Sequence, residues 1–118
     1  MIIQTITATA PATGTSWVCL RVPANVTIKY IQGKNVTRGG NRMVFFLAPT
    51  SITWDPTISA PASLPPALVL QNAVQGSEND DVLFSGDAKT NQTNAQVIGY
   101  FYDSATNDIL ILTVGFVP

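Results

Sequence analysis

The sequence contains no histidine and only one cysteine, and these two shortages exclude most of the chemistry that enzymes use. Histidine is the commonest general base and metal ligand, and it is the usual partner of a serine or cysteine nucleophile. The lone Cys19 cannot form an intrachain disulfide, and without histidine it cannot complete an ordinary zinc, haem or iron–sulfur site. We therefore predict a protein with no metal, no cofactor and no catalytic residues.

The acidic residues leave one catalytic route open, because glycosidases need only a pair of carboxylates. These acids lie mostly in polar loops or beside a turn: Glu78, Asp80, Asp81, Asp87, Asp103 and Asp108. Solvation of the loops explains this placement more simply than catalysis does. We expect the protein not to be an enzyme.

Charge is also scarce, since only 11% of the residues are charged against about 25% in an ordinary soluble domain. Hydrophobic residues make up 46% of the chain, yet no apolar run reaches the roughly 18 residues of a membrane span. A surface with so little charge is typical of proteins that are covered by other protein in an assembly. A somewhat apolar monomer is the alternative.

The few charges are divided unevenly between the two halves of the chain. Residues 1–59 hold five basic side chains and one acidic, whereas residues 60–118 hold one basic side chain and six acidic. The near-neutral total argues against nucleic-acid binding, which favours a strongly basic domain. The division permits subunits that meet through a basic loop and an acidic loop.

Alternation of apolar and polar residues predicts an all-β chain, because the period of two is that of a strand. Cys19 and Trp17 fall inside one such strand and are expected to be buried. Residues 104–107 lie between the last two strands and predict a short hairpin loop, with Asn107 in a left-handed conformation. The predicted strands span residues 2–9, 16–22, 26–32, 43–48, 67–74, 82–85, 95–103 and 108–117.

Five of the eight prolines lie between residues 49 and 66, which therefore cannot form a central strand. We predict an extended arm here, with a short strand near residues 51–54. The arm carries four large apolar side chains that must pack on something: Ile52, Trp54, Ile58 and Leu64. It either folds back over its own domain or grips a neighbouring subunit, and we take these four as candidate partner-binding residues.

The last strand is apolar on both faces, with Ile109, Ile111 and Val117 opposite Leu110 and its alternating neighbours. A lone sandwich covers only the inner face of such a strand, so the outer face needs the arm, a second subunit or another surface. Eight or so strands without helix predict one antiparallel β-sandwich over residues 1–118. We expect a jelly roll, with an immunoglobulin-like sandwich or a small barrel as alternatives.

The glycine-rich loop between residues 33 and 42 adds three further candidates, Lys34, Arg38 and Arg42. A solvated loop is the plainer interpretation, and contact with an acidic protein surface is the sharper one. The N-terminal residues lack the basic and apolar regions of a signal peptide, so we expect no secretion by that route.

In overall style the chain resembles the small jelly-roll decoration proteins on the capsids of tailed bacteriophages. The shared features are a short all-β chain, few charges, no histidine and a proline-rich arm, without a diagnostic motif. The resemblance implies a non-enzymatic virion protein, made in the host cytoplasm, that forms homo-oligomers and braces joints between major capsid subunits. Partners would then be copies of itself and a capsid protein, with no nucleic acid and no membrane. Another virion component, or a carbohydrate-binding sandwich using Trp54, is the alternative.

Overall fold

Strands of eight to eleven residues make up most of the computed structural model, which describes residues 1–38, 42–59, 68–75 and 82–118. The eight strands are β1 (Ile2–Thr9), β2 (Gly14–Arg21), β3 (Thr27–Asn35), β4 (Arg42–Pro49), β5 (Leu68–Gln75), β6 (Val82–Lys89), β7 (Asn94–Ser104) and β8 (Ile109–Val117). The all-β prediction is confirmed, and each of the eight main predicted strands is present. The largest differences are at two strand ends: β3 continues to Asn35, and β6 continues to Lys89 through residues predicted as a loop.

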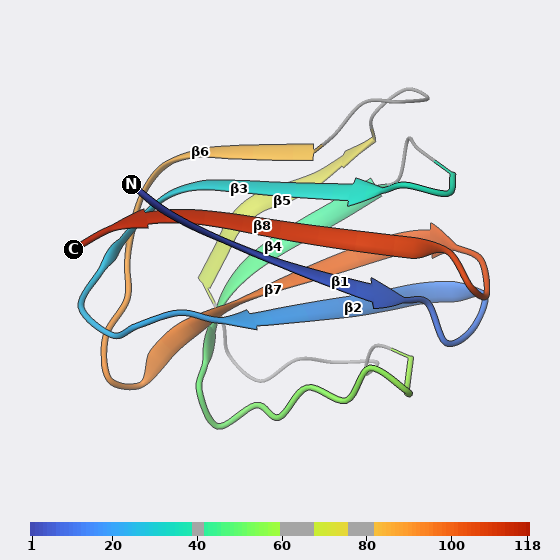
Figure 1. The fold of residues 1–118 in the computed structure, drawn as a ribbon, viewed down its shortest axis with the longest axis horizontal. Coiled ribbons are helices and arrows are strands. Elements are labelled where there is room, and N and C mark those ends of the chain that lie inside the picture. Colours follow the sequence, from blue (N-terminus) through green and yellow to red (C-terminus); the bar gives the residue numbers. More distant parts are fainter. Residues whose placement is uncertain (39–41, 60–67, 76–81) are drawn as a thin grey trace.

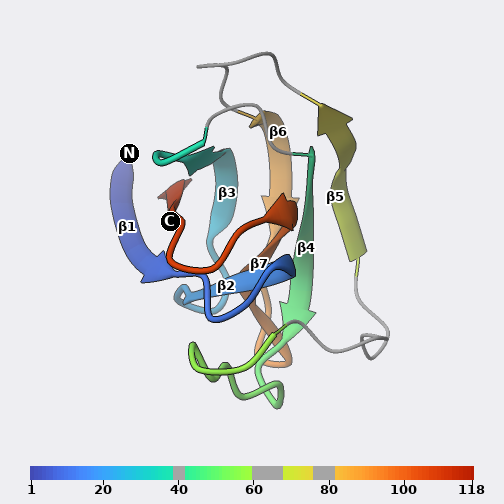
Figure 2. The ribbon, with the colours of Figure 1, turned by 90° about the vertical axis from the view of Figure 1, so that its right-hand side faces the viewer.

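The strands form two antiparallel sheets that face each other as a sandwich (Figures 1 and 2). Sheet A has the order β1-β8-β3-β6, and sheet B has the order β2-β7-β4-β5. Strands that follow one another along the chain lie mostly in opposite sheets. The predicted antiparallel β-sandwich is therefore confirmed.

The predicted hairpin at residues 104–107 is wrong, because β7 and β8 belong to different sheets. β8 pairs instead with β1 and β3, and β7 pairs with β2 and β4. The short turn crosses between the sheets, and Asn107 in it has the expected left-handed backbone, with φ of 73°. Local sequence does predict the turn, but a turn of this length does not reveal whether its two strands pair.

Alternate residues of each strand fill the space between the sheets, which is the pattern that a half-buried strand requires. β8 places Leu110, Leu112, Val114 and Phe116 in this core, where each is almost completely buried. Phe45 of β4 and Phe101 of β7 meet them from sheet B. Burying a side chain of this size stabilises the fold by about 1.5–3 kcal/mol, so the core is the main source of stability.

A second apolar cluster lies on the outer face of sheet B, and residues 50–59 (the covering segment), which run beside β2 (Figure 1), pack against it. The cluster contains Trp17, Cys19, Ala48, Ile98 and Tyr100, with Ile52 and Trp54 of the covering segment packed against it. Trp17 and Cys19 are thus buried as predicted, although beneath this segment rather than between the sheets. The predicted short strand at residues 51–54 is absent from the described structure.

Candidate interaction surface

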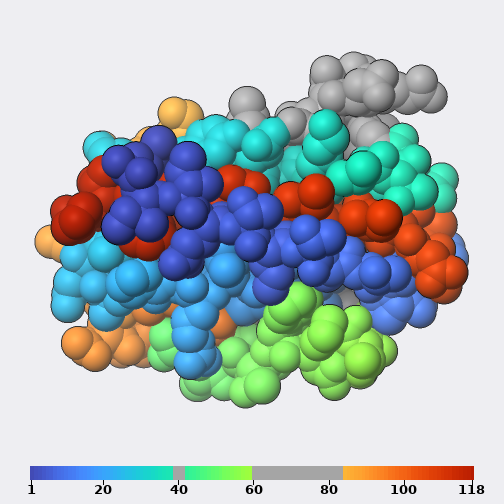
Figure 3. Space-filling view, viewed as in Figure 1, coloured from blue at the N-terminus to red at the C-terminus, as the bar shows by residue number. Residues whose placement is uncertain are grey.

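The outer face of sheet A presents a strip of isoleucine and threonine that runs along β1 and β8. Because the even-numbered residues of β8 fill the core, the odd-numbered residues of both strands point outward. We call these eight residues the β1–β8 strip: Ile3, Thr5, Thr7, Thr9, Ile109, Ile111, Thr113 and Gly115. Figure 3 shows this face of the molecule, with β1 in blue beside β8 in red.

The strip combines exposed apolar side chains with hydroxyl groups. Ile3 is 60% exposed and Ile109 is 42% exposed, and both belong to the few large apolar side chains on the described surface. Thr5 Oγ1 lies 3.1 Å from Thr113 Oγ1 in a cross-strand hydrogen bond. The predicted two-faced character of β8 is confirmed, since Ile109 is exposed and Ile111 is only half-buried.

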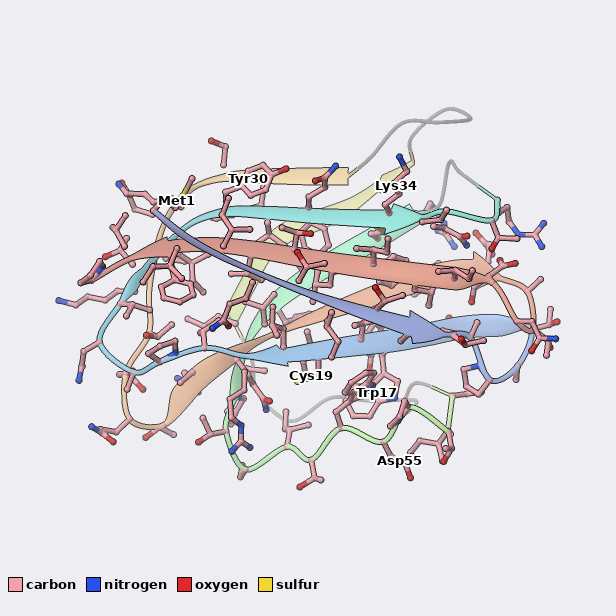
Figure 4. The ribbon with its side chains drawn as sticks, viewed as in Figure 1. Met1, Trp17, Cys19, Tyr30, Lys34 and Asp55 are labelled. Carbon is pink, nitrogen blue, oxygen red and sulfur yellow. The ribbon has the colours of Figure 1, made fainter. Side chains whose placement is uncertain are left out.

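One end of the strip is shaped by Gly115, which lies opposite Ile3 in the register of β1 and β8. A Cβ atom at this position would lie 2.9 Å from Met1 Sδ and 3.4 Å from Tyr30 Cβ. The missing side chain therefore leaves the space into which Met1 leans, beside Tyr30 of β3 (Figure 4). A larger residue at position 115 would displace Met1 and make this end of the strip protrude.

No residue of the strip is charged, and no charged residue occurs in the chain before Arg21. Some of the opposed charges of the two halves of the sequence pair with each other within the described part of the chain. Each described ion pair joins a base of the first half to an acid of the second: Lys29 with Asp87, Arg38 with Asp108, and Arg42 with Asp103. The basic first half and the acidic second half, which could have attracted separate subunits, form these ion pairs within one molecule.

Asp108 is the only one of these acids that is buried, since its side chain is 3% exposed. Asp108 Oδ2 accepts three hydrogen bonds: from Arg38 Nε at 2.9 Å, from Asn35 Nδ2 at 3.0 Å, and from the Ala105 N–H at 2.8 Å. Burial alone would raise the pKa of this carboxyl group. The hydrogen bonds and the positive charge of Arg38 outweigh burial and hold the pKa below 3.8. This carboxylate joins the β7–β8 turn to the end of β3.

The covering segment is held to sheet B by polar contacts as well as by apolar packing. Trp54 Nε1 donates to the carbonyl oxygen of Trp17 at 3.1 Å. Gln96, which is buried in β7, donates from Nε2 to the carbonyl oxygens of Pro49 and Ile52. Its Oε1 accepts a hydrogen bond from Cys19 Sγ at 2.8 Å. Of the two fates predicted for the arm, residues 50–59 therefore adopt the one that folds back over their own domain.

The structure separates the predicted partner-binding residues. Ile52 and Trp54 pack on their own sheet, and Ile58 remains 49% exposed. Leu64, Pro61, Pro65 and Pro66 lie outside the described residues. Arg38 is bound to Asp108, Arg42 pairs with Asp103 and lies 5.1 Å from the ring centre of Tyr102, and Lys34 points outward from β3 (Figure 4).

The strip itself was missed as a site, although its signal is present in the sequence. Alternation puts Thr5, Thr7 and Thr9 on one face of β1, and such a face is ordinarily read as the solvent side of a strand. The lack of any charge over the first twenty residues distinguishes it from an ordinary solvent face. Within the described ranges no cluster of potential metal ligands is found, nor a helix long and apolar enough to cross a membrane.

No family model matches the chain, and no curated protein matches it. Among solved structures, the Drosophila NLP core matches along 100% of both chains, with 13% identity and a TM-score of 0.44. That structure is described in terms of pentamer formation and histone binding.

The full-length structural match comes from a histone-binding protein and not from a component of a capsid. The predicted function as a phage capsid decoration protein is therefore contradicted, and we do not retain it. At this identity and TM-score the match does not give the present chain a function of its own.

Proposed function

We propose that this protein has a non-catalytic role in which copies of the chain assemble through the β1–β8 strip. The observation that carries the proposal is an uncharged surface of isoleucine and threonine, two strands wide, on an exposed sheet face. Surfaces of this kind are unusual on a monomer, where charged side chains normally separate molecules in solution.

The composition of the strip favours burial against protein. Covering Ile3 and Ile109 removes apolar area from water, which contributes about 25 cal/mol per Å². The strip contains no ionised group, so burial incurs none of the desolvation cost of a charge. Threonine hydroxyls can exchange hydrogen bonds with water for bonds across an interface, as Thr5 and Thr113 already do within the sheet.

The non-catalytic part of the proposal rests on the chemistry of the described side chains. The chain has no histidine, and Cys19 is buried, which raises the pKa of its thiol to about 12. A thiol with such a pKa does not form the thiolate that a nucleophile requires near neutral pH. Asp87, Asp103 and Asp108 are each engaged by a basic side chain.

Sedimentation velocity with the wild-type chain and two variants tests this proposal. Wild type should sediment as an oligomer at micromolar concentration, and Ile3→Glu should shift the population toward monomer because it places a charge within the strip. Ile58→Glu is the matched control, since Ile58 is also exposed but lies on the covering segment. It should leave the oligomer intact.

A wild-type chain that remains monomeric across the micromolar range would overturn the proposal. So would an oligomer on which Ile3→Glu has no more effect than Ile58→Glu, because assembly would then use another surface. Circular dichroism of both variants should retain the β-type spectrum, which excludes unfolding as the cause of dissociation.

A further inference from the structure

One edge of sheet A is formed by β1, and its backbone hydrogen bonds can be assigned from the end of the strand. The Ala10 N–H donates to Asp108 O at 2.8 Å, and the Asn107 N–H donates to Ala10 O at 2.9 Å, both toward β8. In an antiparallel ladder the backbone groups alternate in direction from one residue to the next. The even-numbered residues of β1 therefore bond to β8, and the odd-numbered residues direct their N–H and C=O groups away from it.

Ile3, Thr5, Thr7 and Thr9 consequently present a row of backbone donors and acceptors along the outer edge of β1. All four residues are exposed, and no described backbone group outside β8 bonds to them. The pairing of β1 with β8 runs through all eight residues without a register shift, so this edge is regular. A regular exposed edge of this length is a template for another strand.

The other edges whose side chains are described carry features that hinder such pairing. β2 has an irregularity between Gly14 and Ser16 and ends in the exposed Arg21. β6 carries the exposed charges of Asp87 and Lys89, and its pairing with β3 shifts register. Bulges and edge charges are the usual means by which proteins prevent edge-to-edge association. β1 has neither of them, and it has no proline.

We propose that β1 pairs edge to edge with β1 of a second copy of this chain, antiparallel and about a two-fold axis, to join two A sheets into one. The inference rests on the proposed function and adds to it a backbone contact along the edge of β1, beside the face of the strip. A two-fold axis at Thr5 places Thr5 opposite its own copy and Ile3 opposite Thr7. Every residue in that central pairing is uncharged, so no like charges meet.

The observations favour a second copy over a foreign peptide as the occupant of this edge. Peptides that add a strand to a sheet gain affinity from backbone bonds, but pockets and charges for their side chains provide the selection. The strip along β1 is a row of threonine and isoleucine with no charge, which offers no charged group by which to select a foreign sequence. A two-fold contact needs no such selection, because each strand supplies the same surface twice.

Hydrogen exchange measured residue by residue on the wild-type chain tests the pairing directly. In dilute monomer the amides of Ile3, Thr5 and Thr7 should exchange fast, while those of Gln4 and Ile6 are already slowed by β8. Raising the concentration until the chain assembles should slow the three outward amides at least about tenfold. If they exchange at the monomer rate in the oligomer, the edge pairing is overturned, whereas assembly through the face of the strip still stands.

A pair of variants at Thr7 provides a second test. Thr7→Pro removes an N–H that points away from β8, so the sheet keeps its internal bonds and the edge loses a donor. It should dissociate the oligomer, while Thr7→Val, which keeps the N–H, should not. An oligomer that survives Thr7→Pro with an unchanged sedimentation coefficient would contradict the edge pairing. A wild-type chain that never assembles would overturn both this inference and the proposed function.

Discussion

Asp108 shows at the residue scale how a single buried carboxylate can connect two segments of a small sandwich, the end of β3 and the β7–β8 turn. It accepts hydrogen bonds from Asn35 in β3, from Arg38 just after β3, and from the backbone of Ala105 in the β7–β8 turn. These segments lie far apart in the sequence but meet at one end of the molecule. A buried charge of this kind is tolerated because its hydrogen bonds replace those of water.

Asp108→Asn should lower the free energy of unfolding by about 1–3 kcal/mol at pH 7, because charged hydrogen bonds to a buried group are replaced by weaker ones. The pKa of Asp108 in the folded state lies below 3.8, so the stability due to its charge is present above that value. It is lost as the pH falls through the folded pKa. Urea unfolding at pH 7 and about pH 2 should therefore show a gap between wild type and variant that narrows in acid.

Asp103→Asn is the matched control for this measurement. The Asp103 side chain is 73% exposed, and its pair with Arg42 lies at the surface. Exposed ion pairs contribute about 0–1 kcal/mol, so the variant should unfold close to wild type at pH 7. Equal losses in the two variants would show that burial of Asp108 has no particular energetic role.

At the scale of an element, residues 50–59 form a cover over part of sheet B and are held there by hydrogen bonds to β2 and β7. Gln96 holds two carbonyl groups at the start of this segment and at the same time accepts the thiol hydrogen of Cys19. Trp54 adds a hydrogen bond to the backbone of β2. The thiol of Cys19 thus lies beneath the cover and reports whether the cover is in place.

Gln96→Ala should loosen the cover and cost about 1–3 kcal/mol, because two carbonyl oxygens lose a buried donor. The reaction of Cys19 with a thiol reagent at pH 8 measures the loosening. Burial raises the pKa of the Cys19 thiol to about 12, so wild type should react very slowly in the folded state. The variant should react faster at concentrations of denaturant too low to unfold the domain.

Gln92→Ala provides the comparison, since Gln92 is exposed in the turn before β7. In the Gln92→Ala variant, Cys19 should react with the thiol reagent at the same rate as in wild type. If Gln96→Ala reacts no faster than Gln92→Ala, the cover is held by apolar packing alone, and the hydrogen bonds of Gln96 contribute little.

For the whole molecule, the distribution of charge distinguishes association through the uncharged strip from association through oppositely charged loops. The described ion pairs lie within one chain, and the β1–β8 strip carries no charge. An oligomer built on the strip therefore has no charge attraction that salt can screen. Opposed basic and acidic loops on separate subunits would behave in the opposite way.

Raising the salt from about 0.05 M to about 1 M should leave the association constant unchanged or slightly higher, because salt screens charges but not apolar contacts. Sedimentation equilibrium in the two buffers measures this directly. A tenfold loss of affinity in high salt would point instead to charged groups, of which Lys34 on the outer face of β3 is the one to replace first.

Most strands of this fold could be predicted from the sequence, whereas their partners could not. Alternation located β1 to its last residue, since period-two burial is a local property of one strand. The same reasoning joined β7 and β8 as a hairpin and was wrong, because a short turn can also cross between two sheets. Trp54 shows the same limit, because an apolar residue in an arm indicates burial without saying where.

By itself, then, the sequence determined the positions of the strands, since these follow from residue types and from neighbours along the chain. Only the tertiary structure decided that Arg38 meets Asp108, that Ile52 and Trp54 cover their own sheet, and that β1 forms an exposed edge. The physical reason is that these facts depend on registers between strands distant in sequence. Such registers are set by the packing of the whole core, and no single segment carries them.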